Sequence, residues 1–150
     1  MATVFGVGRA PVAPGTFGSA AGVILFLLLS GLSPVLYAVT LVGVTCLAIW
    51  AAEAYERQTG AHDDGRIVID EVTGQLVALT PLVLAGRSRS FFLVVTGFVL
   101  FRVFDVWKPG PIRWLDRNVA GGAGVVLDDV LAGGFAAALL AGVVAVTGFE

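Results

Sequence analysis

The chain has 150 residues, of which 57% are hydrophobic and only 13% are charged, and its net charge is −2. Typical globular domains carry about 25% charged residues, so the composition argues against a water-soluble protein and favours the membrane class. The slightly acidic balance also argues against nucleic-acid binding, which needs a basic face. The length fits one domain, which we assign to residues 1–150.

Uncharged runs separated by turn signals predict an all-α, multi-helix membrane bundle. No side chain from Ala10 to Ala52 is charged, and a breaker at 30–34 divides this run into two helices. The expected helices cover residues 18–30, 35–52, 72–86, 90–107 and 130–149. Each approaches the ~20 residues that cross a bilayer, or does so with its polar end turns included, which predicts about four to five transmembrane helices.

The basic residues predict how these helices are oriented. If the helices cross in turn, seven of the nine Lys and Arg residues fall on one side, and only Arg87 and Arg89 fall on the other. By the positive-inside rule, the side with seven is cytoplasmic. The same threading places ten of the 11 acidic residues on this face. The acidic motifs are therefore expected at the cytoplasmic helix ends.

Small residues suggest how the helices pack. Gly18 and Gly22 are four apart, as are Gly134, Ala138 and Gly142. This spacing favours close approach of helices in membranes, although a general bias towards alanine and glycine would give the same pattern. The single cysteine excludes an internal disulfide, and its apolar neighbours predict that Cys46 is a buried, inert thiol.

The stretch from Phe101 to Asp129 differs most from the rest of the chain. It combines a helix end, a charged loop and a glycine-rich entry into the last helix, and it holds four of the 11 acidic and four of the nine basic residues. Residues 121–124 (GGAG) either let a ligand approach the backbone or form a flexible turn. Because the flanking segments are almost uncharged, the function is expected in this stretch.

Acidic side chains recur at helix ends on the predicted cytoplasmic face. They form three clusters, which are Asp63–Asp64 with Asp70–Glu71, Asp105, and Asp128–Asp129. Carboxylates without accompanying histidine or cysteine ligands favour a hard cation, and Mg²⁺ is the usual partner where the substrate is a phosphate. The alternative is a set of solvated helix ends, which we accept for Glu53, Glu56 and Asp116. Acids at membrane depth are instead expected to be functional.

Two further features suit a phosphate ligand. Lys108 follows Asp105 by three residues, so it either binds phosphate, pairs with Asp105 or anchors the helix at the headgroups. Residues 13–19 open an apolar helix with free N–H groups and the hydroxyls of Thr16 and Ser19, which suit an anion. An ordinary helix cap is the alternative for these hydroxyls.

Together these motifs resemble the phosphatidylglycerophosphatase A family of bacterial membrane lipid phosphatases. The resemblance extends from about Pro11 to Leu140 and is carried by PGTFGS (14–19), HDDGRIVIDEVTG (62–74) and FRVFDVWKPGPIRWLDRNVAGGAGVVLDDVLAG (101–133). It implies an all-α bundle that hydrolyses phosphatidylglycerophosphate to phosphatidylglycerol and phosphate with Mg²⁺. The expected location is the bacterial cytoplasmic (inner) membrane, with the active site facing the cytoplasm.

The resemblance also implies roles for single residues. Metal binding and catalysis would fall on Asp70, Glu71, Asp105, Asp128 and Asp129, with Glu71 as a ligand or general base. Thr16, Ser19, Lys108 and Asp63 would bind the phosphate of the substrate. Direct attack by water and a phosphoenzyme formed on a carboxylate both remain open, as does a homo-oligomer.

Two other functions stay open on the sequence. A small membrane transporter or channel subunit could use its intramembrane carboxylates as an ion path, but its acids should then be staggered through the depth of the bilayer. A soluble helical bundle that binds a phosphorylated small molecule is disfavoured by the low content of charged residues.

Overall fold

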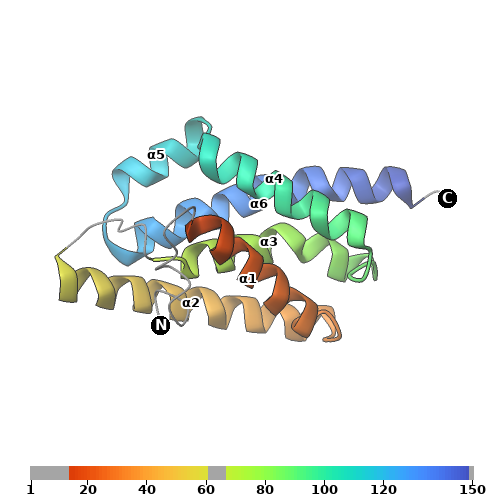
Figure 1. The fold of residues 1–150 in the computed structure, drawn as a ribbon, viewed down its shortest axis with the longest axis horizontal. Helices are drawn as coiled ribbons and strands as arrows, with labels where there is room; N and C mark the ends of the chain where they lie inside the picture. Colours follow the sequence, from red (N-terminus) through yellow and green to blue (C-terminus); the bar gives the residue numbers. More distant parts are fainter. Residues whose placement is uncertain (1–13, 61–66, 149–150) are drawn as a thin grey trace.

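The computed structural model describes residues 14–60 and 67–148, and these residues form six helices without any strand (Figure 1). The helices are α1 (Pro14–Leu29), α2 (Pro34–Thr59), α3 (Ile69–Leu84), α4 (Phe91–Trp107), α5 (Gly110–Asn118) and α6 (Gly121–Thr147). The prediction of an all-α fold is therefore confirmed for the described part of the chain.

Helix α3 lies at the centre of the bundle. It packs against α1, α2, α4 and α6, most extensively against α6, and buries Leu76, Leu79 and Leu82 completely. Figure 1 shows that α3 and α6 begin at the same end of the bundle at which α2 and α4 end, and that α5 lies at this end too. The motifs from distant parts of the sequence therefore meet at one end.

Local signals set the limits of α2. Ser33 accepts a hydrogen bond from the Leu36 N–H at 3.3 Å, and Pro34 follows in the first turn, where a helix needs no N–H donor. At the other end, Gly60 has a φ of 67° and donates its N–H to the Glu56 carbonyl at 2.8 Å. The helix therefore extends past the apolar run that ends at residue 52 and includes Glu53, Glu56 and Arg57, which were expected to end it.

The charged loop expected between the last two long helices contains a helix of its own, α5. Pro111 lies in its first turn, where proline is favoured. Ile112 is fully buried, whereas Arg113 and Arg117 are exposed, so the segment is amphipathic and packs by one face. The expectation of an irregular loop is wrong here.

Helix α6 begins at Gly121, well before the predicted start at residue 130, so the GGAG segment is its first turn. Gly122 lies against α2 so closely that a side chain would overlap the Ile49 carbonyl oxygen, 2.5 Å away. The Gly122 N–H also donates to Glu53 Oε2 at 2.9 Å. Glu53 was expected only to be solvated, but it satisfies a free N–H at the start of α6 as well as pairing with Arg57 at 3.0 Å.

The outer surface of the bundle is apolar. Leu28, Val35 and Phe91 are 76%, 75% and 82% exposed, and soluble monomers rarely expose large contiguous apolar patches. Among the described helices, α2 and α6 are long and apolar enough to cross a membrane by length and composition, and α1 is a shorter apolar helix. These observations support association with a membrane, while the number of crossings stays a prediction.

The small residues of α1 pack as predicted. A side chain at Gly18 would place its Cβ 3.0 Å from the Cβ of Val68, and one at Gly22 would place it 2.8 Å from the Cβ of Gln75. Both glycines are buried. They let α1 approach the central helix closely.

The same prediction for α6 is wrong for contacts within the chain. Among the described residues, no part of another helix lies within 4 Å of the position of a Cβ at Gly134 or Gly142, whereas Gly133 lies against the carbonyl of Gly74 on α3. Cys46, expected to be buried, is exposed on α2 because much of this helix faces outwards. Apolar surroundings in the sequence do not distinguish burial in protein from an outward apolar face.

The neighbouring glycines of α6 provide a matched test of this packing. We expect Gly133→Ala to lower the free energy of unfolding by about 1–3 kcal/mol, because its Cβ would overlap α3. Gly134→Ala should be neutral or should stabilise by up to about 1 kcal/mol, since alanine favours helix more than glycine. Thermal unfolding of both variants in the same detergent measures the difference. Equal losses of stability would contradict the packing of α6 on α3.

Candidate functional site

Five of the predicted acidic residues lie at the same end of the bundle. Asp70 and Glu71 are in the first turn of α3, Asp105 is in the last turn of α4, and Asp128 and Asp129 lie about two turns into α6. Asp63, the other predicted acid, is outside the described residues. The helices thus gather acids that are up to 59 positions apart in the sequence.

Three of these acids form a cluster that fits a metal ion. Asp70, Glu71 and Asp129 each offer a carboxylate oxygen, and the three oxygens lie within 4.8 Å of one another. Asp70 Oδ1, Glu71 Oε2 and Asp129 Oδ2 are buried and have no hydrogen-bond partner among the described residues. Buried carboxylates without partners are costly, and a cation would compensate them. The all-oxygen donor set fits a hard divalent cation such as Mg²⁺.

Backbone contacts between α3 and α6 determine how close these carboxylates lie. Gly74 follows Asp70 by one helical turn, and a Cβ there would lie 2.6 Å from the carbonyl oxygen of Asp129. Gly133 follows Asp129 by one turn and contacts the Gly74 carbonyl in the same way. Because neither glycine has a side chain, the helices approach closely enough to bring their acids together.

Arg102 connects α4 to the start of α1. Its Nη1 donates to Asp105 and lies 3.4 Å from Ser19 Oγ, within hydrogen-bond distance. A Cβ on Gly15 would lie 2.5 Å from Glu71 Oε1 and 3.1 Å from Arg102 Nη1, so α1 begins directly over both side chains. Arg102 is absent from the predicted site residues. Its position three residues before Asp105, in an otherwise apolar helix, is the sequence signal that could have found it.

Lys108 contacts a different acid from the one that spacing suggests. It ends α4 with a φ of 45°, which turns the chain away from the helix. Its Nζ donates to Asp128 at 2.6 Å and to Asp116 at 2.7 Å. The ion pair considered between Lys108 and Asp105 is not formed, because Asp105 pairs with Arg102. The expectation that Asp116 is only solvated is also wrong.

The Lys108 ammonium stays charged in this environment. Burial alone would lower the pKa of Lys108, but its hydrogen bonds to Asp116 and Asp128 and the charges of these acids raise the pKa above its ordinary value. Because the pKa of Lys108 is higher in the folded state than in the unfolded chain, its charge stabilises the fold fully at neutral pH. This stabilisation is lost only as the pH rises above the ordinary pKa of lysine. At neutral pH the Lys108 ammonium is therefore charged and donates to both carboxylates.

Asp128 in turn lies next to the cluster of Asp70, Glu71 and Asp129. It is only 4% exposed, and its Oδ1 accepts a hydrogen bond from the Asp129 N–H at 3.0 Å. Asp128 and Asp105 thus differ from the three clustered acids, since each is paired with a cation. Their predicted metal roles stay predictions.

The two predicted hydroxyls lie in different positions. Ser19 is fully buried, and its Oγ donates to the Gly15 carbonyl at 2.9 Å as well as lying near Arg102. Thr16 is exposed in the first turn of α1, and the described residues give its hydroxyl no hydrogen bond. The structure therefore brings Ser19 into the site and leaves Thr16 at its edge.

The arrangement suits an anionic ligand with several oxygens. Three carboxylates could hold a divalent cation, and the guanidinium of Arg102 and the ammonium of Lys108 lie among the surrounding acids. A cation held by carboxylates, with further positive charges close by, is a common way to bind and activate a phosphate.

Three known proteins are similar in sequence to this chain over most of its length. Phosphatidylglycerophosphatase A of Escherichia coli K12 is 39% identical over 140 residues, which cover 93% of this chain and 79% of the relative. The Haemophilus influenzae protein of the same name is 38% identical over 133 residues, covering 88% of this chain and 79% of the relative. A Bacteroides thetaiotaomicron protein with the provisional name phosphatidylinositol-3-phosphatase is 39% identical over 144 residues, which cover 93% of this chain and 88% of the relative.

No solved structure gives a significant match to the chain. The family model for phosphatidylglycerophosphatase A matches residues 1–144. This match, with the two relatives that carry the same name, spans all five acids of the site and both of its cations. The chain therefore belongs to the phosphatidylglycerophosphatase A family.

Proposed function

We propose that the chain is a Mg²⁺-dependent lipid phosphatase that hydrolyses phosphatidylglycerophosphate to phosphatidylglycerol and phosphate. The observation that carries the proposal is the cluster of Asp70, Glu71 and Asp129 at one end of an apolar bundle, where each acid has a buried oxygen without a hydrogen-bond partner among the described residues. The names of two relatives support this substrate, and the name of the third supports the wider class of lipid phosphomonoesters.

Asp70, Glu71 and Asp129 would hold the Mg²⁺ ion. Asp105 is close enough to Glu71 and Asp129 for their charges to interact, so it lies at the border of the same centre. When bound, the metal would stabilise the negative charge of the phosphate. Three carboxylates would leave room around the Mg²⁺ ion for water and for oxygens of the substrate, as is usual for Mg²⁺ sites that act on phosphates.

The cations and hydroxyls would orient the phosphate. Arg102 offers N–H donors beside Ser19 at the start of α1, and Thr16 lies one turn earlier on the exposed side. Lys108 would act mainly by holding Asp128 in place, since its ammonium already has two carboxylate partners. Binding of phosphate to Lys108 would require it to release one of these partners.

In the direct route, the oxygen of a water molecule bonds to phosphorus while the bond from phosphorus to the lipid oxygen breaks. The water loses a proton, and the lipid oxygen gains one. If Glu71 acts as the general base and not as a metal ligand, it would accept the proton of the water, because it is the least buried of the three clustered acids. The products are phosphatidylglycerol and inorganic phosphate.

The proposed location is a bacterial cytoplasmic membrane crossed by about four to five helices, with the site on the cytoplasmic face. Apolar outer surfaces, the two helices of spanning length and the excess of basic residues at the end that holds the site support this placement. An ion path is not favoured, because the described acids of the site gather at one end of the bundle and are not staggered along it.

Metal binding can be tested through stability as well as activity. We expect Mg²⁺ to raise the melting temperature of the native protein, since a ligand at 100 times its Kd adds about 2.7 kcal/mol. Asp129→Asn should lose this rise and most of its phosphate release from phosphatidylglycerophosphate. With the metal chelated, the variant should melt at the same or a higher temperature than the native protein, because it removes one of the clustered negative charges.

Glu56→Gln serves as the control for loss of a carboxylate, because Glu56 lies on α2 outside the cluster. It should keep both the thermal response to Mg²⁺ and the release of phosphate. An unchanged response to Mg²⁺ in Asp129→Asn would remove Asp129 from the metal site. Phosphate release that needs no divalent cation would contradict the metal-dependent mechanism.

Lys108 is tested by a double-mutant cycle with Asp128. Lys108→Met should destabilise the protein by about 2 kcal/mol, below the ~3–5 kcal/mol of fully buried pairs because the ammonium is partly exposed. Adding Asp128→Asn should restore part of this loss, since position 128 then no longer carries a buried charge that lacks its partner. Unfolding of the four proteins in one detergent gives the coupling energy. Purely additive losses would contradict the contact between Lys108 and Asp128.

Topology is tested with two matched alanine positions in a Cys46→Ser background. Ala120 precedes α6 at the end that holds the site, and Ala85 follows α3 at the opposite end; both are exposed. In whole cells, a membrane-impermeant maleimide should label Ala85→Cys and should reach Ala120→Cys only after the membrane is permeabilised. The reverse pattern would place the active site outside the cytoplasm.

A further inference from the structure

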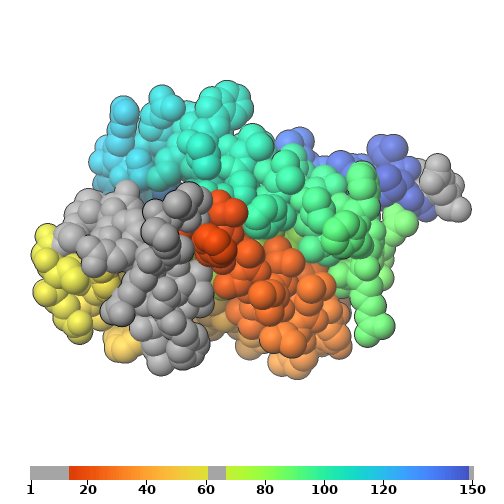
Figure 2. Space-filling model, viewed as in Figure 1, coloured from red at the N-terminus to blue at the C-terminus, as the bar shows by residue number. Residues whose placement is uncertain are grey.

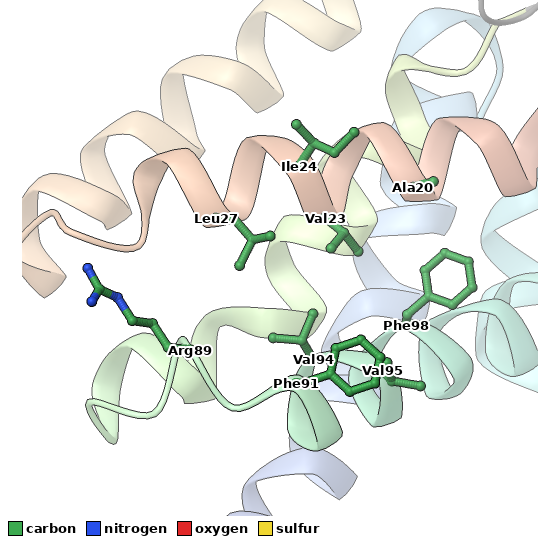
Figure 3. Close-up of a pocket in the computed structure, with 9 residues that line it drawn as sticks. All are labelled: Ala20, Val23, Ile24, Leu27, Arg89, Phe91, Val94, Val95 and Phe98. Carbon is green, nitrogen blue, oxygen red and sulfur yellow. The ribbon is translucent and has the colours of Figure 1, made fainter.

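An apolar groove of about 460 Å³ lies between α1 and α4 (Figure 3). Its walls come from Ala20, Val23 and Leu27 on α1 and from Phe91, Val94 and Phe98 on α4. Figure 3 shows that the side chains of Val23 and Leu27 point from α1 towards the side chains of α4, with Arg89 at the far end. The two helices make few contacts with one another, so the space between them stays open.

The groove begins beside the proposed phosphate site. Ala20 directly follows Ser19, and Phe98 lies about one helical turn before Arg102, so both walls start next to the contact between Arg102 and Ser19. In the space-filling view, α1 and α4 lie next to each other on the face shown (Figure 2). A molecule in the groove could therefore reach the site without crossing the protein interior.

The charge near the groove and the length of the groove fit an acyl chain with an anionic headgroup. Phe98 also lines a shallow depression that contains Arg102 and Arg113, so positive side chains mark the end of the groove nearest the site. From Arg102 to Phe91 the helix rises roughly 16 Å at 1.5 Å per residue. The groove can therefore hold an acyl chain lengthwise when the headgroup sits at the arginines.

We infer that the groove between α1 and α4 binds an acyl chain of the lipid substrate and so places its phosphate at the acidic cluster. The inference rests on the proposed function. Arg113 would attract the phosphate that joins the headgroup to the lipid backbone, and the terminal phosphate would lie at Arg102 and the carboxylates. The protein would thereby select a phosphomonoester carried on a membrane lipid over a free sugar or glycerol phosphate.

Photolabelling tests the groove without relying on catalysis. Phosphatidylglycerophosphate with a diazirine in its acyl chain is reacted with the full-length protein in vesicles, and the labelled peptides are identified by mass spectrometry. We expect label on α1 and α4 in excess over that left by phosphatidylcholine with the same chain. Ala20→Phe, which fills the groove, should remove this excess. Ala138→Phe on α6 should not, because Ala138 is exposed and lies outside the groove.

Kinetics provide the second measurement. In mixed micelles, Ala20→Phe should raise the KM for the diacyl substrate about fivefold. The effect is modest because the acyl chain moves into the groove from lipid, which is just as apolar. The kcat/KM for the deacylated headgroup, glycerophosphoglycerophosphate, should be the same as in the native protein. Ala138→Phe should match the native protein with both substrates. Melting temperatures establish that both variants fold.

The outcomes separate this inference from the proposed function. Selective labelling of α1 and α4 supports the groove as the site of the acyl chain, whether or not the native protein releases phosphate. A lack of phosphate release would overturn only the proposed function. Equal labelling by the two lipids, or a KM for the diacyl lipid unchanged in a folded Ala20→Phe variant, would overturn the inference. Conversion of a dimer to a monomer by Ala20→Phe, with labelling unchanged, would assign the groove to a second copy of the chain and would also overturn it.

Discussion

The structure depends on a cluster of carboxylate groups whose oxygens are buried between two helices. Asp70 and Glu71 on α3 and Asp129 on α6 point carboxylate oxygens at one another where the two most extensively packed helices begin to touch. Like charges in such a position oppose folding unless something positive joins them. The rest of the site limits the number of negative charges that lack a partner, because Arg102 pairs with Asp105 and Lys108 pairs with Asp128. Among the described residues, three buried carboxylate oxygens remain without a hydrogen-bond partner, one each from Asp70, Glu71 and Asp129.

Polar contacts near these acids also connect parts of the chain that the sequence separates. Lys108 joins the end of α4 to α5 through Asp116 and to α6 through Asp128. Glu53 joins the end of α2 to the first turn of α6 through the Gly122 N–H. Arg102 links α4 to α1 through Ser19. At the end of the bundle that carries the acids, these polar contacts thus add to the apolar packing of Ile69, Val125 and Val126.

Much of this fold follows from local patterns in the sequence, and the departures have physical reasons. Long uncharged runs predict helices well, because a helix satisfies all its backbone groups without outside help. The start of α6 was placed too late, since a GGAG segment suggests a break unless the carboxylate that caps it, Glu53, is known to be nearby. Similarly, α5 depends on burial of Ile112 against the bundle, which its charged sequence does not reveal.

The candidate site was predictable in its membership more than in its contacts. The acids stand out because the surrounding sequence is so apolar, and their place at helix ends follows from the order of the helices. The partner of Lys108 was not predictable from spacing, since the left-handed conformation at this residue ends the helix there and directs the side chain to α6. The spacing of Arg102 from Asp105 is visible in the sequence, but its contact with Ser19 on α1 exists only in the folded bundle.

The glycine contact beneath the acids has a consequence for which ions the centre can accept. Gly74 and Gly133 fix the distance between the backbones of α3 and α6 one turn away from Asp70 and Asp129. Backbone atoms in direct contact cannot move closer, and they separate only if the whole bundle loosens. A centre built this way has little freedom to expand around a larger ion, and rigid small cavities favour Mg²⁺ over Ca²⁺, which needs more ligands at longer distances. Gly74 and Gly133 would therefore limit the size of the ion that the site can bind, although neither contributes a ligand atom.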